Sequence, residues 1–311
     1  MDRLPVIVGV DGSPDSERAL YWAAEAARLR SAPLQVVHVW PYVTSARAAD
    51  AEAGTGDAVL EELRAKLAAG PELPEVEFRS LSGLTDVILP GLGEQAQLLV
   101  LGSRGRGGFA SLLLGSNGMA CAAHSAAPVV VVPRPDRGGA RPEAADEGGS
   151  ARPHGRVVLG IDPTTEEAGE SSAIDFAFQE AARRGAVLQA VAAYMWPMAV
   201  PVAFDYVVAY DTTQREYEDT LGKQVSALLA RYRERYPDVP VEAELVPADA
   251  AGQLVEESRR SDLVVVGRHR RRLPIGPRLG SVAHAVLLHA LCPIAVVPEA
   301  VREEAPKAAA E

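Results

Sequence analysis

The chain has little of several features that would narrow its class. Its 311 residues include two cysteines, Cys121 and Cys292, and only 5% aromatic residues. The two thiols lie in opposite halves, so we expect neither a disulfide framework nor a metal site built on cysteine. No apolar run approaches the roughly 18 residues that cross a membrane, and no basic segment precedes an early apolar stretch. We therefore expect a cytoplasmic protein without a membrane segment.

Basic residues are in the minority. The chain has 42 acidic residues against 31 lysines and arginines, which gives a net charge of −11. Binding to nucleic acid or to anionic membranes needs a basic surface, so this balance argues against both as partners. One basic run, residues 268–272 with Arg278 beyond it, contains no interleaved aromatic residue. It could bind phosphate through guanidinium groups, but we favour a solvated loop or a contact with the other half of the chain.

Motifs of common catalytic sites are absent. The chain contains no G-x-S-x-G and no H-E-x-x-H sequence, and its six histidines form no metal-ligand spacing. His38 lies in a predicted strand, where we expect a packed structural residue. From these residues we predict no catalytic group and no metal site.

What the chain does have is a glycine pattern that occurs twice. Gly102 and Gly105 are followed, after nine intervening residues, by Gly115 and Ser116. The same pattern recurs at a constant offset of 165 residues, except that Arg270 replaces the second glycine, at Gly267, Gly280 and Ser281. A repeat of this length indicates two copies of a whole domain, because solenoid repeats are only about 20–50 residues long.

Strands and helices alternate in each half. Short apolar runs bounded by turn residues predict strands, and Ser13 followed by Pro14 predicts a helix start. In the first half we predict strands at 4–10, 34–40, 76–81, 98–101 and 129–132, and helices from 14 and at 57–69, 84–95 and 116–125. In the second half we predict strands at 156–161, 187–194, 241–245, 263–266 and 294–297, and helices at 171–184, 211–236 and 252–259.

This alternation predicts an α/β fold with two doubly wound, five-stranded parallel-sheet domains in tandem. Domain 1 is predicted at 1–135 and domain 2 at 155–299. Between them, residues 136–154 are rich in glycine, proline and charge and read as a linker, and residues 300–311 read as a flexible tail.

The glycine pattern predicts a phosphate site. Gly102 and Gly105 remove side chains that would keep backbone N–H groups away from an anion. Gly115 and Ser116 open a helix whose N-terminal amides and dipole favour negative charge. Asp11 directly follows the first predicted strand, and ligands of open parallel sheets bind beyond the carboxyl ends of the strands. The spacing is neither Walker A nor G-x-G-x-x-G, so it describes a different loop.

The sequence resembles the universal stress protein family in its tandem form. The resemblance rests on residues 8–13, on His38-Val39, on the glycine pattern and on the closing segments 128–133 and 293–298. It implies a Rossmann-like fold in which the first half binds ATP, with or without Mg²⁺. The residues that it implies for this binding are Gly9, Val10, Asp11 and Val39 at the adenosine end, and Gly102, Gly105, Gly115, Ser116 and Asn117 at the phosphates.

The second half departs from the family pattern. Its equivalent binding residues are Asp162, Gly267, Gly280 and Ser281. However, Arg270 would crowd the phosphates, and Pro163-Thr164 replaces Gly12-Ser13 in a longer loop that contains three glutamates. Whether this half binds nucleotide stays open.

Together with the resemblance, these features predict a protein that binds ATP as a sensor without efficient turnover and acts on an unidentified protein partner. The stress-response role and a bacterial source are what the resemblance implies. A nucleotide-free scaffold or chaperone-like protein is one alternative. A slow ATPase is another, because phosphoryl transfer depends mostly on positioning and electrostatics. The resemblance also implies that the two domains pair through their last strands, 129–132 with 294–297, as a pseudo-dimer. A homodimer of whole chains stays open.

Overall fold

The structure is a computed structural model of the chain. It describes residues 3–40, 57–68, 75–105, 114–135, 154–164, 171–196, 204–268 and 279–299, with the backbone alone at 204–213. The predicted tail, Arg270 and all of the predicted linker except His154 lie outside these residues.

Ten strands of the described residues form one sheet, in the order β3-β2-β1-β4-β5-β10-β9-β6-β7-β8. The strands of the first half are β1 (Val6–Val10), β2 (Leu34–Trp40), β3 (Val76–Ser82), β4 (Leu98–Gly102) and β5 (Val129–Val132). Those of the second half are β6 (Arg156–Ile161), β7 (Val187–Ala193), β8 (Val241–Val246), β9 (Leu263–Arg268) and β10 (Ile294–Pro298). All pairs within a half are parallel, which confirms the predicted α/β fold of two parallel-sheet domains.

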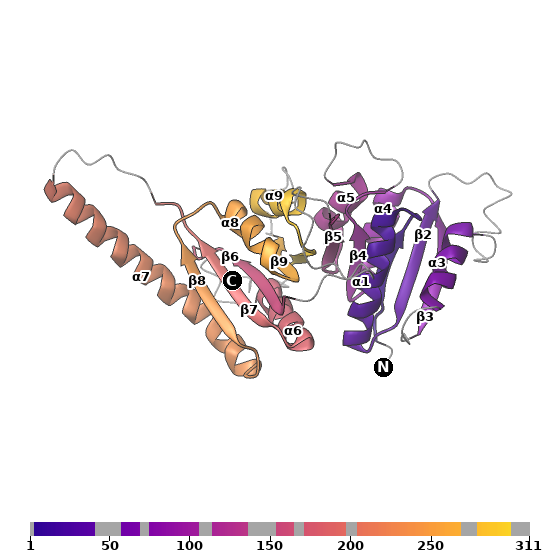
Figure 1. Cartoon of the computed structure of the whole chain (residues 1–311), viewed down its shortest axis with the longest axis horizontal. Coiled ribbons are helices and arrows are strands. Elements are labelled where there is room, and N and C mark those ends of the chain that lie inside the picture. The colour runs from indigo at the N-terminus through magenta and orange to yellow at the C-terminus, as the bar shows by residue number, and fades with distance from the viewer. Residues whose placement is uncertain are drawn as a thin grey trace, which may run out of the picture.

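Helices cover both faces of this sheet (Figure 1). One face packs against α1 (Pro14–Arg30), α3 (Ala58–Ala68), α6 (Ser172–Arg184) and α7 (Phe204–Arg235). The other face packs against α4 (Thr85–Gly91), α5 (Ser116–His124), α8 (Ala250–Glu257) and α9 (Ser281–His289). Because both faces are buried, the central strands are continuous apolar runs, as in β1, where all five residues are buried.

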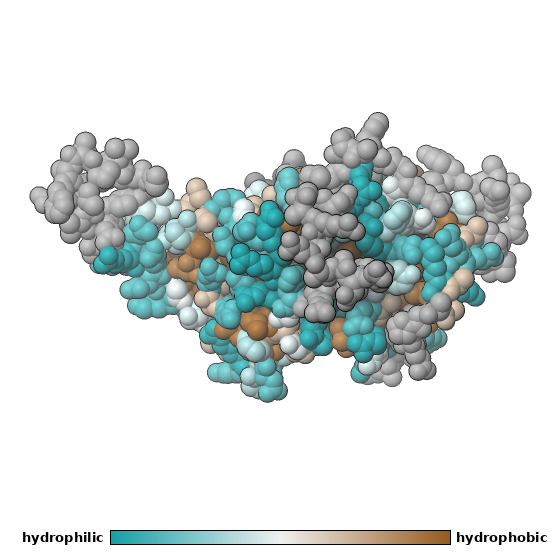
Figure 2. Space-filling model, in the orientation of Figure 1, coloured by the Kyte–Doolittle hydropathy of each residue, from teal (hydrophilic) through white to brown (hydrophobic). Residues whose placement is uncertain are grey.

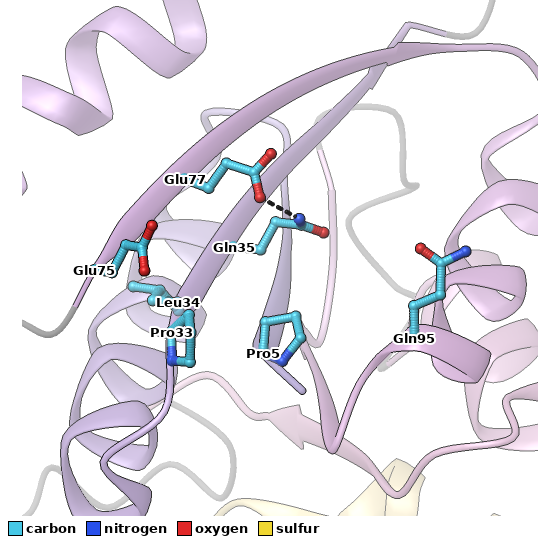
Figure 3. Close-up of a pocket in the computed structure, with 7 residues that line it drawn as sticks. All are labelled: Pro5, Pro33, Leu34, Gln35, Glu75, Glu77 and Gln95. Carbon is cyan, nitrogen blue, oxygen red and sulfur yellow. Dashed lines mark hydrogen bonds between the residues drawn. The ribbon is translucent and has the colours of Figure 1, made fainter. Parts of the chain in front are cut away.

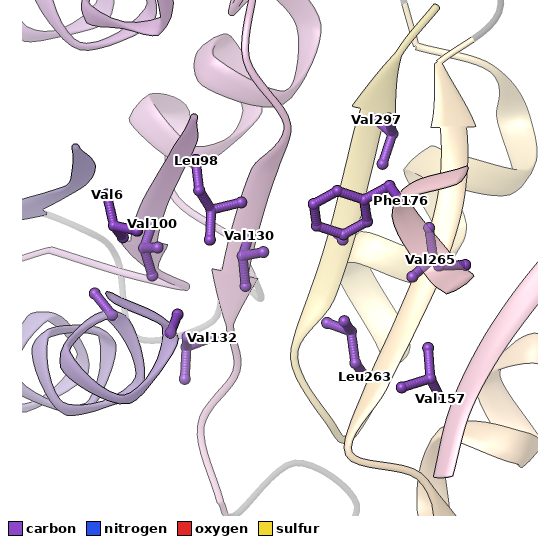
Figure 4. Packing of buried hydrophobic residues seen from close by; sticks show 14 of the residues in the cluster. Val6, Leu98, Val100, Val130, Val132, Val157, Phe176, Leu263, Val265 and Val297 are labelled. Carbon is purple, nitrogen blue, oxygen red and sulfur yellow. The ribbon is translucent and has the colours of Figure 1, made fainter. Parts of the chain in front are cut away.

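The two halves join through β5 and β10, which pair antiparallel with Ile294 opposite Val131 and Val296 opposite Val129. This pairing confirms the pseudo-dimer that the resemblance implies. In Figure 4, Val130 of β5 and Val297 of β10 lie on the two facing strands, and Phe176 of α6 lies against β10. The core is therefore continuous across the join between the domains.

Two predicted helices differ from the structure by more than a shift of one or two residues at their ends. The helix predicted at 84–95 is α4 followed by a 3-10 turn, η1 (Leu92–Gln95), because Pro90 has no N–H to continue the α-helical ladder. The helix predicted from residue 211 begins at Phe204, so that α7 spans 32 residues and projects beyond the sheet (Figure 1). The second 3-10 turn, η2 (Ser258–Arg260), follows α8.

The face shown in Figure 2 is mostly hydrophilic, and its hydrophobic residues form separate patches. Among the residues that the structure describes, no helix has both the length and the apolar character needed to cross a membrane.

A buried ion pair joins the two domains on the α1 side of the sheet. Arg30, the last residue of α1, lies 2.5 Å from the carboxylate of Glu180 in α6, and their side chains are only 3% and 0% exposed. Arg183 and Arg184 of α6 also contact Glu180, at 3.0 and 3.2 Å. Burial lowers the pKa of Arg30 to about 10, although the Glu180 carboxylate opposes this change. Arg184 also stacks over the ring of Trp22 in α1, at 5.1 Å.

We predict that Glu180→Ala lowers the free energy of unfolding by about 3–5 kcal/mol, because it leaves the Arg30 guanidinium buried without its carboxylate. The matched control is Glu25→Ala, which breaks the exposed Glu25–Arg28 pair and should cost only about 0–1 kcal/mol. Urea unfolding of both full-length variants measures the difference. Equal losses in the two variants would contradict the prediction.

Candidate functional site

The candidate site of domain 1 lies where the strand order reverses. β1 pairs with β2 on one side and with β4 on the other, so the loops after β1 and β4 leave the sheet in opposite directions. A crevice at such a switch point is where open α/β sheets bind ligands. Gly9 lies opposite Leu101 in the register, which brings Asp11 and Gly102 to neighbouring strand ends.

The turn after β1 is fixed by hydrogen bonds to and from Asp11. One oxygen of its carboxylate, Oδ1, accepts from the Ser13 amide at 3.0 Å, and the Asp11 amide donates to Ser16 Oγ at 3.3 Å. Gly12 between them has a φ of 73°, in the left-handed region that favours glycine. Ser13 then caps α1 by accepting from the Ser16 amide at 3.2 Å, as the sequence predicted.

The end of β4 and the loop after it pass close to their neighbours at two glycines. A Cβ on Gly102 would lie 2.5 Å from the carbonyl oxygen of Asp15. A Cβ on Gly105 would lie 2.5 Å from Asp11 Oδ2. The Ser13 hydroxyl also donates to the Arg104 carbonyl at 3.4 Å, which ties the loop to the start of α1. The structure thus brings Asp11, Gly102 and Gly105 together.

The start of α5 lies against the same loop. The Gly115 amide donates to the carbonyl oxygen of Ser103 at 2.8 Å, and Gly115 is the N-cap of α5. Among the described residues no side chain caps the helix there, and Ser116 and Asn117 are exposed. The first N–H groups of a helix have no partner within it. This end of α5 therefore presents amides and a positive dipole end beside Asp11 and the glycine loop, which together suit an anionic ligand.

A buried polar network under this loop escaped the sequence analysis. Asp15, whose side chain is 3% exposed, accepts from Ser103 Oγ at 3.1 Å and forms ion pairs with Arg18 at 2.6 Å and Arg134 at 3.2 Å. Ser103 is completely buried. The network ties the start of α1 and Ser103, the residue after β4, to Arg134, two residues beyond the end of β5. Asp15 looked only like an acidic residue in the first turn of a helix, and no local pattern links it to Arg134.

Three other predicted site residues serve mainly the core. A Cβ on Gly9 would lie 2.6 Å from Leu101 Cδ2, so glycine is needed there for packing. The side chains of Val10 and Val39 are buried in the cores on opposite faces of the sheet, with the residues 5% and 7% exposed. A ligand at the crevice would therefore meet chiefly their backbone.

His38 belongs to a buried polar cluster beside the site. Its Nδ1 lies 2.8 Å from Asp57 Oδ2, which also accepts from Ser80 Oγ at 2.8 Å and from Trp40 Nε1 at 3.1 Å. The other Asp57 oxygen accepts from the amides of Val59 and Leu60 at the start of α3. Burial raises the pKa of Asp57, but the hydrogen bonds from His38 and Ser80 outweigh it, so the pKa lies below the ordinary value of 3.8. His38 is thus a packed structural residue, as predicted.

The equivalent crevice of domain 2 is built differently. Asp162 is exposed, and its carboxylate accepts from both the amide and the hydroxyl of Thr164. A Cβ on Gly267 would make only ordinary contacts, at 3.5 Å or more. Glu299 caps α6, accepting from the Ser172 amide at 3.2 Å and from Ser171 Oγ at 3.1 Å. As in domain 1, no side chain caps the second helix of the pattern, α9, which begins after Gly280 with the exposed Ser281.

The described residues hold no other obvious chemical centre. They contain no group of three histidine, cysteine, aspartate or glutamate side chains that could bind a metal ion. Burial raises the pKa of the Cys121 and Cys292 thiols to about 12, so both are unreactive. A pocket of about 290 Å³ lies at the amino ends of β1 to β3, on the edge of the sheet opposite the candidate site (Figure 3). Gln35, which lines it, already bonds Glu77 and Arg79.

Comparison with known proteins identifies the family. The model of the universal stress protein family matches residues 3–133 and again residues 154–298. The chain therefore belongs to the universal stress protein family, in its tandem two-domain form. Universal stress protein Rv1996 of Mycobacterium tuberculosis is 33% identical over 318 residues, which cover 94% of this chain and 95% of that protein.

Solved structures share the fold. The structure of a functionally unknown protein, PA1789 from Pseudomonas aeruginosa, covers 95% of this chain and 92% of its own, with a TM-score of 0.62 at 14% identity. A universal stress protein in complex with cAMP is 32% identical to this chain and covers 41% of it and 95% of its own length, with a TM-score of 0.34.

We predict that Asp57→Asn lowers the free energy of unfolding by about 1–3 kcal/mol at pH 7, because it removes a charged acceptor from a buried cluster. The pKa of Asp57 is lower in the folded protein than its ordinary value of 3.8. Its charge therefore stabilises the fold above about pH 4, and this contribution is lost as the pH falls through the folded pKa. Urea unfolding between pH 7 and pH 3 should show the variant and wild type converging in acid.

The control for this experiment is Asp249→Asn, which alters an exposed aspartate that caps α8. It should cost less at pH 7, because the cap remains in contact with water. A constant difference between Asp57→Asn and wild type from pH 7 to pH 3 would show that the Asp57 charge does not stabilise the fold.

Proposed function

We propose that domain 1 binds an adenine nucleotide, ATP with or without Mg²⁺, and that the protein is a stress-response sensor without efficient turnover. The observation that carries this proposal is the meeting of three features at the strand switch point: the Asp11 carboxylate, the close-packed glycine loop and the uncapped start of α5. Few other ligands have both a sugar hydroxyl that can donate to a carboxylate and several phosphate groups that can accept from backbone amides.

In this proposal, different residues bind the nucleoside and the phosphates of the ligand. Gly105 lacks a Cβ over Asp11 Oδ2, so that oxygen can accept a hydrogen bond from the ribose or the adenine edge. The amides of Ser116 and Asn117 at the start of α5 bind the phosphates, favoured by the dipole of α5, while Gly102, Gly105 and Gly115 line the phosphates without side chains. Binding shifts the protein towards a form that a protein partner in the cytoplasm recognises.

The surroundings of the phosphates favour binding over hydrolysis. The buried carboxylate nearest to the loop, Asp15, is held by the Ser103 hydroxyl and by Arg18 and Arg134. Its oxygens are already engaged by these groups, so Asp15 is poorly placed to accept a proton from an attacking water molecule. A slow ATPase would need turnover that is lost with Asp11→Ala while the fold survives.

For domain 2 we propose that nucleotide binding is weak or absent. Glu299 stands 165 positions after Arg134, and each side chain reaches the start of the first helix of its own domain. The charge at this position is therefore reversed between the domains. The Glu299 carboxylate already occupies the amide of Ser172 and repels phosphate near Gly267, whose added Cβ would lie 3.7 Å from Glu299 Oε1. The protein would then bind one nucleotide per chain.

We predict that calorimetric titration of the nucleotide-free protein with ATP and Mg²⁺ gives one site per chain, and that Gly105→Arg abolishes it. The new side chain would displace the loop or Asp11, because its Cβ begins 2.5 Å from Asp11 Oδ2. Gly91→Ala in α4 is the matched control, since a Cβ there meets no atom within 4 Å. This variant should bind ATP as wild type does.

The outcomes separate the proposals. Two sites in the wild type, with one left in Gly105→Arg, would show that domain 2 also binds nucleotide. An absence of heat up to millimolar ATP would overturn the sensor proposal and favour the nucleotide-free scaffold.

A further inference from the structure

The two ends of α5 have different hydrogen-bond partners. Its start, at Gly115, has no side-chain cap and faces the glycine loop of domain 1. Its C-terminal end is capped by a residue of domain 2. Arg268 donates from Nη1 to the carbonyl oxygen of Ala122 at 3.1 Å and from Nη2 to that of Ser125 at 2.8 Å. The last carbonyls of a helix have no partner within it, so Arg268 acts as a C-cap supplied by the other domain.

Arg268 is well placed to hold the helix still. It is the last residue of β9, where its backbone lies opposite Pro298 of β10 in the sheet. β10 in turn pairs with β5 of domain 1. The guanidinium therefore extends from a rigid strand of domain 2 to the end of a helix in domain 1, and its two bonds limit both sliding and rotation of α5.

The contact also explains part of the basic run at 268–272. We had favoured a solvated loop or a contact with the other half of the chain for this run. For Arg268, the described member of the run, the contact is with domain 1, through backbone carbonyls. At the equivalent position in domain 1 the chain has Ser103, which donates within its own domain to Asp15. The sequence around Arg268 and Ser103 does not indicate that one side chain bonds to the other domain and the other bonds within its own.

We propose that Arg268 is a positioning residue for the nucleotide site of domain 1. This inference rests on the proposed function, because it concerns the same site. α5 has nine residues and is about 13 Å long, so a displacement of its C-terminal end is transmitted to its amides at Ser116 and Asn117. A helix this short has little stability of its own and depends on its contacts. The positive charge at its C-terminus also complements the dipole that attracts phosphate at the other end.

The placement makes domain 2 a part of the domain 1 site even if domain 2 binds no nucleotide. Arg268 directly follows Gly267, at the start of the second glycine loop. A shift of the end of β9 would therefore also move the group that holds α5. The coupling runs through one side chain and one helix, so it can be tested by single substitutions in the full-length protein.

The test is calorimetric titration with ATP and Mg²⁺ of wild type, Arg268→Ala and Arg268→Lys. We expect Arg268→Ala to weaken ATP binding about fivefold or more, at the lower end of the usual range for coupled sites. Arg268→Lys keeps the charge but not the planar fork that reaches two carbonyls, so its affinity should lie between the other two. Arg259→Ala is the control, because Arg259 belongs to domain 2 and its guanidinium pairs with the exposed Glu256 of the same domain. It should bind within about twofold of wild type.

A second readout separates positioning from general stability. Hydrogen exchange without nucleotide should speed up in α5 in Arg268→Ala while the protection of β4 and β1 is kept. A merely structural role would instead lower protection throughout the domain and leave the affinity of the folded fraction unchanged. If Arg268→Ala does not fold, Arg268→Lys carries the comparison.

Failure of the inference and failure of the function look different. If wild type binds ATP and Arg268→Ala and Arg268→Lys both bind equally well, the positioning role is overturned and the nucleotide site stands. If wild type shows no binding, the proposed function falls, and the role of Arg268 at that site falls with it.

Discussion

The structure depends on the antiparallel pairing of β5 with β10. Without it, each five-stranded sheet would end in a strand of four or five apolar residues with unpaired backbone groups, a form that proteins avoid exposing. The pairing turns two sheets into one and makes their cores continuous. It also decides which helices meet. α1 comes beside α6, where Arg30 and Glu180 form a buried ion pair, and the end of α5 comes within reach of Arg268.

At the candidate site, the residues that could contact a ligand are also constrained by packing within the protein. Gly102 and Gly105 are small because the backbone of α1 and the Asp11 carboxylate lie against them, and Gly9 is small because Leu101 packs over it. Packing alone therefore favours glycine at Gly102 and Gly105, the same residue type that the proposed phosphate site needs. In domain 2 the close approach is relaxed at Gly267, and a carboxylate fills the neighbouring space.

Much of the fold could be predicted from the sequence, because buried parallel strands are continuous apolar runs and the repeat fixes their number. Ser13 and Pro14 located the start of α1 for the same local reason. The site was predicted less completely. Its glycines and Asp11 form a local pattern, but the links from Asp15 to Arg134 and from Glu299 to α6 join residues more than a hundred positions apart. Which side chains meet across such distances is decided by packing. The early start of α7 at Phe204 likewise has no local signal.

Glu180 lies at the contact between two related domains, and its carboxylate is supplied by domain 2 alone. In an assembly of two identical subunits, a residue at such a contact would face or neighbour its own copy, and a lone carboxylate could not be placed there without a second. Joining both domains in one chain removes this restriction. The covalent connection also makes the pairing of the two domains an intramolecular event. The pairing therefore does not depend on the concentration of the protein. A change such as the reversal from Arg134 to Glu299 can then arise in one crevice while the other is preserved.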